Sequence, residues 1–481
     1  MHHFALPVVR NSKTRNPFGV FPVSFGIFRQ HLEMGLNVVL NLSVASKRVF
    51  SIAWPAIGEA YLQNLLGVVD TFFIAKLGLV AIDAVGVTNV YSMTFIGVFI
   101  AISAALSVFL SRAIGAKDNE RGRSAVWHGL VIAVAIGVVL GVISVVLATP
   151  LLHIMGAHGQ LQRTAFPYFR TVLGLSPLIA LFTAQSASFR AIGDTKTPLR
   201  VGLEMNVVHV ILDYVLIFGV GPIPGWGIAG AGWAMILARV YASVRLWIKS
   251  RQVETLALTR KDVVFRKTLV FSMIKFAIPA AIERLSMRLG QVIYFGLIVR
   301  MGVDVYATHN IAGTVTTFAY TIGGGFATAA TTTIGQAIGS GNESDALAYR
   351  RASYIQSAVF MTAVTAILCA TSPWFGLLFT HNQRVIHLLT IILAIDIVSQ
   401  PFLAAVLVDT AAIQAGGNSK YPMIVTTIGI WIVRTLGVYV FAWKLGLGLP
   451  AVWASIAVDN ALRALLFAWY RNKMNWIRVL T

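Results

Sequence analysis

The stretch TNVYSMTFIGVFIAISAALSVFL, from Thr88 to Leu110, contains no Asp, Glu, Lys or Arg. A helix needs roughly 20 mainly apolar residues to cross the hydrocarbon core of a bilayer, and this stretch meets that length. The windows 310–334 and 353–375 are equally free of charge, and 126–148 adds only His128. These four windows predict transmembrane helices and set the class of the protein.

Composition supports the same class. The 481 residues are 57% hydrophobic and 12% charged, whereas soluble domains carry about 25% charged residues. We therefore predict an all-α membrane protein with twelve transmembrane helices. The turn Gly221-Pro222-Ile223-Pro224-Gly225 separates the fifth from the sixth, because its prolines cannot continue a helix. The predicted spans are 50–72, 88–110, 126–148, 166–188, 202–220, 227–247, 272–296, 310–334, 353–375, 386–408, 424–443 and 449–470.

Charge distribution predicts the orientation. The chain has 38 basic and 18 acidic residues, a formal net charge of +20. Lys and Arg collect in the cytoplasmic loops of membrane proteins, so the excess does not indicate a nucleic-acid partner. Sixteen Lys and Arg lie in even-numbered loops and five in odd-numbered loops. We expect a multi-pass protein of the cell (inner or plasma) membrane with both termini in the cytoplasm.

Several chemical classes receive no support. The one cysteine, Cys369, excludes an internal disulfide, and the ten histidines lack metal-ligand spacing. Gly323-Gly324-Gly325 is not followed by the Gly-Lys-Ser/Thr of a nucleotide-binding loop. Because no catalytic residues gather in a loop, we expect no enzyme, no metal site and no cofactor apart from a coupling ion.

An internal repeat appears when the chain is aligned with itself at an offset of 224 residues. A repeat of six spans returns the chain to its starting side, so the halves share one orientation. We therefore expect two six-helix bundles related by a pseudo-two-fold axis along the membrane normal. The aligned residues include Pro55 with Pro279, Glu59 with Glu283, Gly78 with Gly302, Ala113-Ile114-Gly115 with Ala337-Ile338-Gly339, and Pro177 with Pro401.

The repeat divides the chain into segments. The N-terminal arm is basic, holds early prolines and lacks the pattern of a signal peptide. We expect it to be loosely ordered and to lead into a short interfacial helix before Val49. The predicted segments are an arm at 1–47, an N-terminal lobe at 48–247, a charged cytoplasmic linker at 248–268, a C-terminal lobe at 269–472 and a tail at 473–481.

Several of the repeated sequence motifs resemble those of a known family. FRAIGDTKTP, from Phe189 to Pro198, closely resembles the loop signature of the multidrug and toxic compound extrusion (MATE) transporters. Val69-Asp70-Thr71 ahead of Leu77-Gly78 is similar to the family's first helix, and the resemblance runs from about 48 to 472. Gly335-Gln336-Ala337-Ile338-Gly339 resembles its eighth span, and Leu212-Asp213-Tyr214-Val215-Leu216-Ile217 its fifth.

This resemblance implies a V-shaped pair of six-helix bundles that exports organic cations or other amphipathic drugs. Inward flow of protons or sodium ions drives the export. In many bacterial members an aspartate on the first helix and an Asn/Asp pair on the fifth serve the cation site. By motif these correspond to Asp70, His209 and Asp213, and His209 departs from the usual Asn.

Acidic residues inside the spans are candidates in their own right, because an ionised side chain at the bilayer centre costs about 2.5–3.5 kcal/mol. Asp70 and Glu59 lie eleven residues apart on one stripe of a helix. We interpret Asp70 as a cation ligand, the alternative being a helix-end cap. For Glu59 a structural hydrogen bond is favoured over a functional role.

The fifth span carries a second group. His209 and Asp213 are four residues apart, and Asn206 lies one turn earlier on the same face. A carboxylate beside an imidazole in a low-dielectric site forms a proton-binding unit. Asp213 is therefore expected to serve ion coupling. His209 either takes part in coupling or only orients Asp213.

The second half offers weaker candidates. Glu283 occupies the repeat position of Glu59. It either takes part in transport or forms a structural ion pair, for which Arg434 is the suggested partner. Asp396 is a further candidate on the tenth span. Asp409 and Asp459 are interpreted as polar contacts near membrane boundaries.

We predict a cation-coupled multidrug antiporter working by alternating access, with protons favoured over sodium because of His209. Its expected partners are small-molecule drugs or organic cations and membrane lipid, and the expected state is a monomer. The alternative is a flippase for a lipid-linked precursor, which would need a more cationic central cavity. A channel is disfavoured because no filter-like segment is present.

Overall fold

The computed structural model describes residues 23–474, 476 and 477, with side chains from Val44 onward except that of Ile223. Within these residues the chain is almost entirely helical. The first half contains α1 (Val23–Ala75), α2 (Leu79–Gly115), α3 (Asn119–Val146), α4 (Ala148–Ile154), α5 (Gly159–Gly174), α6 (Ser176–Ile192), α7 (Lys196–Phe218) and α8 (Gly227–Ser250). The second half contains α9 (Lys267–Val299), α10 (Val303–Gly339), α11 (Glu343–Phe375), α12 (Gln383–Ala415), α13 (Lys420–Ile428) and α14 (Gly448–Lys473).

Short elements complete the chain. The predicted Gly-Pro turn forms a hairpin in which β1 (Gly219–Val220) pairs with β2 (Ile223–Pro224). A 3₁₀ turn, η1 (Arg260–Asp262), lies in the segment between α8 and α9, and η2 (Gly376–Leu378) follows α11. The eleventh span continues from α13 as π-helix through η3 (Gly429–Thr435) and η4 (Val438–Lys444).

Membrane-spanning character follows from helix length and hydropathy. In the described part of the chain, eight helices pass both tests, and the bent pair α5–α6 makes a ninth span. The helices α1, α9 and α10 are long enough to cross but less apolar, because α9 carries several charges and α10 is rich in threonine and glycine. With them the molecule has twelve transmembrane helices in two bundles, as predicted.

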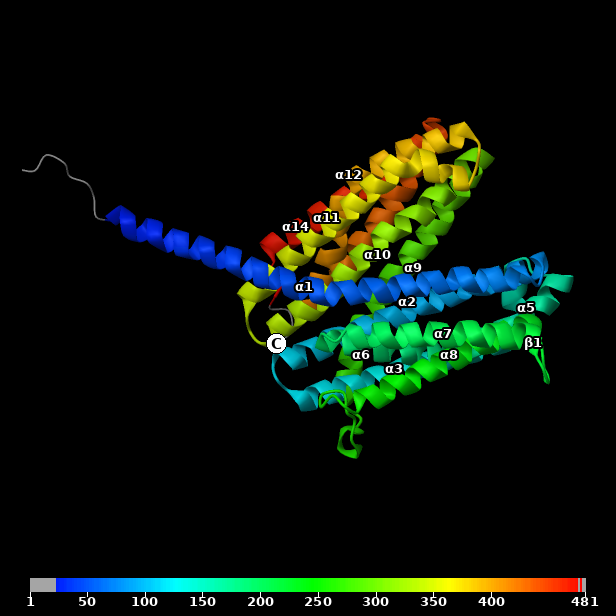
Figure 1. The fold of residues 1–481 in the computed structure, drawn as a ribbon. Coiled ribbons are helices and arrows are strands. Elements are labelled where there is room, and N and C mark those ends of the chain that lie inside the picture. Colours follow the sequence, from blue (N-terminus) through cyan, green and yellow to red (C-terminus); the bar gives the residue numbers. More distant parts are fainter. Residues whose placement is uncertain (1–22, 475, 478–481) are drawn as a thin grey trace, which may run out of the picture.

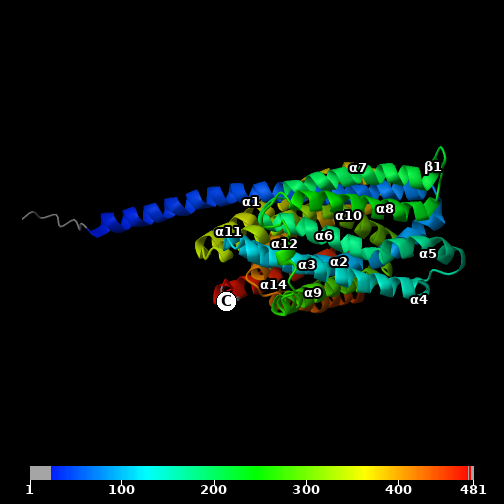
Figure 2. The ribbon, with the colours of Figure 1, turned by 90° about the horizontal axis from the view of Figure 1, so that it is seen from below.

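The two bundles form the arms of a V (Figure 1). Helices α1–α8 build one arm and α9–α14 the other. The arms touch at the end of the molecule that holds Gly115 and Gly339, and they diverge toward the end that holds β1. Seen from below, the helices of both arms run in roughly the same direction (Figure 2).

The first helix of each arm packs into the opposite arm. Val49 and Ile52 of α1 are buried in the apolar core of the second arm, against Phe326 of α10. Met273 and Phe276 of α9 are buried in the core of the first arm. These are equivalent positions at the 224-residue offset, so the exchange obeys the pseudo-two-fold symmetry that the repeat predicts.

The contact between α2 and α10 obeys the same symmetry. A Cβ atom added to Gly115 would lie 1.9 Å from the carbonyl oxygen of Gln336, and one added to Gly339 would lie 2.1 Å from that of Arg112. Gly115 and Gly339 are equivalent, and so are Arg112 and Gln336. Only glycine permits this approach, which explains why the repeat retains glycine at both positions.

The N-terminal prediction requires a correction. The helix α1 begins at Val23, so residues 23–47 are helical and are not a loosely ordered arm with a short separate helix. No proline lies between Pro22 and Pro55, so nothing in this stretch forces a break. The part of the predicted arm before Val23 lies outside the described residues.

Candidate functional site

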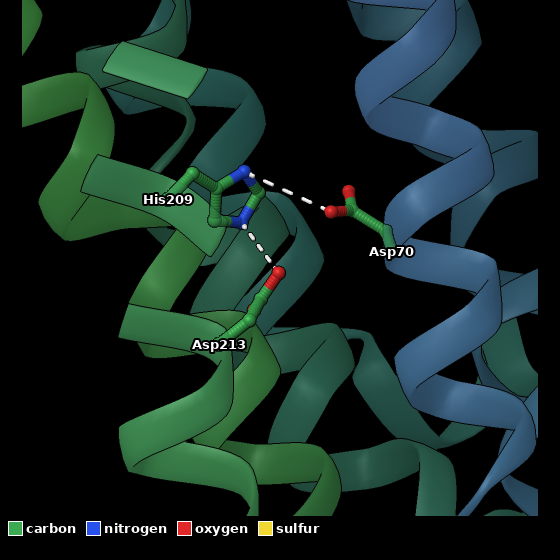
Figure 3. A group of neighbouring side chains, drawn as sticks. All are labelled: Asp70, His209 and Asp213. Carbon is green, nitrogen blue, oxygen red and sulfur yellow. Dashed lines mark ion pairs between the residues drawn. The ribbon is translucent and has the colours of Figure 1, made fainter. Parts of the chain in front are cut away.

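Three candidate residues converge between α1 and α7 (Figure 3). His209 Nδ1 lies 3.8 Å from Asp70 Oδ1, and His209 Nε2 lies 3.6 Å from Asp213 Oδ2. One ligand atom from each side chain falls within 4.8 Å of the other two. Each ring nitrogen therefore faces one carboxylate, the two carboxylates also lie close enough to interact with each other, and the three side chains form one polar site.

Helix geometry explains this convergence. His209 and Asp213 are four residues apart on α7, so they share one face of the helix. Asn206, one turn earlier, donates a hydrogen bond from Nδ2 to the carbonyl oxygen of Leu62 at 2.9 Å. This bond joins α7 to α1 eight residues before Asp70. Asn206 therefore helps to position α7 against α1.

The site is largely buried, and two of its carboxylate oxygens lack hydrogen-bond partners in the part of the chain that the structure describes. The side chains of His209 and Asp213 are each only 2% exposed, whereas that of Asp70 is 25% exposed. Among the described residues, neither Asp70 Oδ1 nor Asp213 Oδ2 has a hydrogen-bond partner. These are the oxygens that face His209. A buried oxygen without a partner is costly, so a proton or a cation placed here would be strongly stabilised.

Two further residues surround the site that sequence reasoning missed. Arg239 of α8 and Tyr168 of α5 lie close enough to interact electrostatically with Asp70. Arg239 also donates a hydrogen bond to the carbonyl oxygen of Met235 at 3.2 Å. A signal for Arg239 existed, because it is an arginine inside a predicted span and aligns with Arg463 at the repeat offset.

Glu59 and Glu283 lie outside this site. Arg190 Nη1 contacts both carboxylate oxygens of Glu59, at 2.9 and 3.0 Å. At the equivalent position in the second arm, Gln414 donates to Glu283 at 3.2 Å, and Thr426 donates at the same distance. The repeat therefore keeps the acid in both arms but replaces its cationic partner by a neutral amide.

The suggested ion pair between Glu283 and Arg434 is wrong. Arg434 Nη2 lies 2.6 Å from Asp459 Oδ2 instead, and Arg463 Nε lies 3.0 Å from the other oxygen of Asp459. Asp459 is completely buried and pairs with both arginines at once. None of the described contacts joins Arg434 to Glu283. Asp459 is an ion-pair centre of the second arm.

The remaining acids also have local partners. Asp396 accepts a hydrogen bond from Gln400, one turn away on α12, at 2.6 Å. Asp409 is paired with Arg350 at 2.6 Å and Arg471 at 2.8 Å. Of the seven candidate residues, the structure therefore brings together Asp70, His209 and Asp213, with Asn206 adjacent. Glu59, Glu283 and Asp396 lie elsewhere.

Relatives agree with this architecture. A protein from Thermotoga maritima described as "Probable multidrug resistance protein NorM" is 29% identical over 87% of this chain and 90% of its own length. "Uncharacterized transporter YisQ" from Bacillus subtilis is 26% identical over 89% of this chain and 95% of its own length. Both similarities span nearly the whole of each protein.

A solved structure shares the fold. It is described as the outward-facing conformation of a multidrug resistance MATE family transporter of the MOP superfamily. It superposes with a TM-score of 0.83 at 22% identity, covering 90% of this chain and 97% of that one. The MatE family model matches residues 55–215 and again 279–440, once in each half of the repeat. The chain therefore belongs to the MATE family, which consists of multi-pass membrane transporters and not of enzymes.

Proposed function

We propose that this protein is a multidrug exporter that couples the outward passage of organic cations or amphipathic drugs to the inward flow of protons. The proposal takes its substrate class from the relatives, which are named as multidrug resistance proteins. It takes its coupling site from Asp70, His209 and Asp213. No organic cofactor is required, because the coupling ion supplies the driving force.

The observation that carries the proposal is the pair of buried carboxylate oxygens without partners. Asp70 Oδ1 and Asp213 Oδ2 both face one imidazole at distances too long for hydrogen bonds. Binding a proton supplies a donor, so it satisfies an oxygen that is otherwise desolvated at a cost. Such a carboxyl group holds its proton while its surroundings exclude water, and it releases the proton when water enters the site.

Protons are favoured over sodium by the ligand set. Sodium, as a hard cation, prefers oxygen ligands, and His209 places a nitrogen where the family commonly has an amide oxygen. The two carboxylates can take up and release protons, while they are the only oxygen ligands that the three side chains offer sodium.

The coupling site is peculiar to the first arm, which supports a functional role. The equivalents of Asp70, His209 and Asp213 at the repeat offset are Tyr294, Val433 and Gly437. The second arm folds without acids at these positions, so the fold itself does not require Asp70 and Asp213 in the first arm. Burying these carboxylates lowers the stability of the folded protein, and a role in transport explains why they are present.

Alternating access fits the arrangement of the arms. Asp70 lies five residues before the end of α1 at Ala75, and that end of α1 lies where the arms diverge (Figure 1); the Asp70 side chain remains a quarter exposed. At the other end Arg112 donates to the carbonyl oxygen of Ala415 at 2.6 Å, and Gln336 donates to that of Ala191 at 3.0 Å. These equivalent bonds hold that end closed, so transport would require breaking them while the divergent end closes.

Orientation and assembly complete the proposal. The closed end carries the basic loops, so we place it and both termini in the cytoplasm, in a monomer of the cell membrane. Cysteines introduced at Lys117 and Lys196 should then react with an impermeant reagent only from the cytoplasmic side. The relatives described above do not favour the flippase alternative, and acids rather than excess cations form the site.

The decisive experiment is drug efflux from proteoliposomes under an imposed proton gradient and, separately, an imposed sodium gradient. We expect efflux with the proton gradient alone. Efflux driven only by sodium would contradict proton coupling, and no efflux with either gradient would contradict coupling by these ions.

A further inference from the structure

An open hollow of about 190 Å³ lies between the beginning of α7 and the end of α8, away from the coupling site. It is lined by Thr197, Arg200, Val201, Glu204, Arg245 and Lys249. Three of these side chains are cationic and one is a carboxylate. The hollow therefore carries an excess of two positive charges.

The single carboxylate is already engaged. Glu204 accepts two bonds from Arg245, at 2.8 and 3.1 Å, and a third from the hydroxyl of Tyr241 at 3.1 Å. This group fixes the guanidinium in place. Within the described residues, Lys249 makes a long hydrogen bond of 3.5 Å to Gln252, and Arg200 is exposed. Arg200 and Lys249 thus remain able to bind an anion.

The surroundings identify the kind of anion. Leu203 and Val207 of α7 are 52% and 54% exposed, and Val244 of α8 is 52% exposed. On a membrane-spanning helix these side chains face acyl chains. The hollow lies where this apolar surface ends and the basic segment between α8 and α9 begins. A ligand with a negative head and apolar chains matches both parts of the surface.

The second arm lacks three of the hollow's four charges and keeps the fourth, because Lys249 is equivalent to Lys473. The positions equivalent to Arg200, Glu204 and Arg245 are Ile424, Ile428 and Trp469, which are 48%, 42% and 52% exposed. An apolar, lipid-facing surface is therefore sufficient for the same pair of helices in the second arm. The first arm has replaced that surface by a basic hollow.

We propose that this hollow binds the phosphate headgroup of an anionic phospholipid whose acyl chains lie along α7 and α8. Arginine binds phosphate through its planar fork and lysine as a point charge, so both residue types suit this ligand. Basic pockets between transmembrane helices are known to bind anionic headgroups. Thr197, in the first turn of α7, already donates from its N–H and its hydroxyl to Asp194, at 3.0 and 2.6 Å, so Arg200 and Lys249 must hold the phosphate.

The test compares purified protein with two variants of equal charge change. Arg200→Gln combined with Lys249→Gln removes the available cations of the hollow and leaves the Arg245–Glu204 pair intact. Arg260→Gln combined with Lys261→Gln removes two exposed cations from η1, outside the hollow. The titrants are phosphatidylglycerol, phosphatidylcholine and water-soluble glycerol 3-phosphate, and the readouts are thermal stability in detergent and lipid retention by native mass spectrometry.

We expect phosphatidylglycerol to stabilise the wild type and the η1 variant and to remain bound to both. The hollow variant should bind it about thirtyfold more weakly, since each basic residue near an anionic headgroup contributes about fivefold. Equal stabilisation by phosphatidylcholine, undiminished binding by the hollow variant, or an equal effect of glycerol 3-phosphate would each overturn the proposal. If the double variant does not fold, Arg200→Gln and Lys249→Gln are measured singly, with about fivefold expected for each.

Discussion

Glu59 and Arg190 form a partly buried ion pair of 2.9 Å that joins α1 to α6, and its equivalent in the second arm is a hydrogen bond between Glu283 and Gln414. The side chain of Glu59 is 5% exposed. A buried carboxylate that loses its partner is left with an uncompensated charge. The pair therefore engages the Glu59 carboxylate within the first arm, and the structural role expected for Glu59 stays a prediction.

The first prediction tests that role. Arg190→Gln reproduces the second arm's Gln414 but leaves Glu59 without a cation, so the free energy of unfolding should fall by about 3 kcal/mol. Thermal melting in detergent measures the loss. The double variant Glu59→Gln/Arg190→Gln removes both charges and should recover most of the stability and retain drug efflux. A double variant that folds well but transports nothing would assign Glu59 to the transport mechanism instead.

The second prediction concerns the close approach of α2 and α10. Gly115→Ala places a methyl group against the carbonyl of Gln336, so the arms must separate at their closed end. We expect spin labels on α2 and α10 near this end to report longer distances. Gly324→Ala is the matched control on α10, because nothing lies within 4 Å of the added atom. Unchanged distances in the Gly115→Ala protein would show that the contact does not hold the arms together.

The third prediction is a pH dependence in the segment between α8 and α9. Burial opposes ionisation of Asp262, but hydrogen bonds from Thr259 and Arg123 outweigh it and hold the pKa below the usual 3.8. A lowered pKa means that the ionised form stabilises the folded state. That contribution is present above pH 3.8 and is lost as the pH falls through the lower, folded-state value.

Hydrogen exchange of residues 251–266, corrected for the intrinsic effect of pH, measures this contribution. The segment should lose protection when the pH falls below the range in which Asp262 is ionised. Asp262→Asn should show the low-pH behaviour already at pH 7. Glu254→Gln changes an exposed acid of the same segment and should behave as the wild type. Equal protection in the Asp262→Asn and wild-type proteins at pH 7 would refute the assignment.

Much of the architecture was predictable because the membrane imposes it locally. Each charge-free stretch such as 88–110 predicts a membrane-spanning helix, and the 224-residue repeat predicted the symmetry that the α1 and α9 exchange confirms. The extent of α1 was not predictable from composition. Its N-terminal part mixes apolar and polar residues without a charge-free run of membrane-spanning length, and only the lack of proline between Pro22 and Pro55 indicates that the helix continues.

The candidate site was predictable in part. Asp70, His209 and Asp213 stood out because ionisable groups are rare inside apolar spans, and two of them share a helix face. Arg239 and Tyr168 were missed, since their proximity to Asp70 depends on how α5 and α8 pack. The Glu283–Arg434 pairing failed for the same reason. The sequence showed that Glu283 and Arg434 both lie inside predicted spans, but it did not show that helix packing places Asp459, and not Glu283, against Arg434.

The last prediction concerns the coupling site itself. Asp213→Asn keeps the shape of the side chain and removes its charge, so folding should survive or improve while gradient-driven efflux is lost. His209→Asn supplies an amide oxygen in place of a nitrogen, which leaves three residues with oxygen ligands around one point. This variant should still transport, with a different pH optimum and a newly acquired response to a sodium gradient. If the optimum moves by about one pH unit, the free energy of proton binding has changed by about 1.4 kcal/mol.

Proteoliposome efflux, measured across pH and under each gradient separately, distinguishes the two roles left open for His209. If His209 takes part in coupling, His209→Asn changes the pH profile and the ion preference together. If it only orients Asp213, His209→Asn lowers the rate at every pH and leaves the ion preference unchanged. Wild-type efflux by a well-folded Asp213→Asn protein would instead move the coupling site to Asp70 alone or to Glu283, whose carboxylate has only neutral hydrogen-bond donors among the contacts described for it.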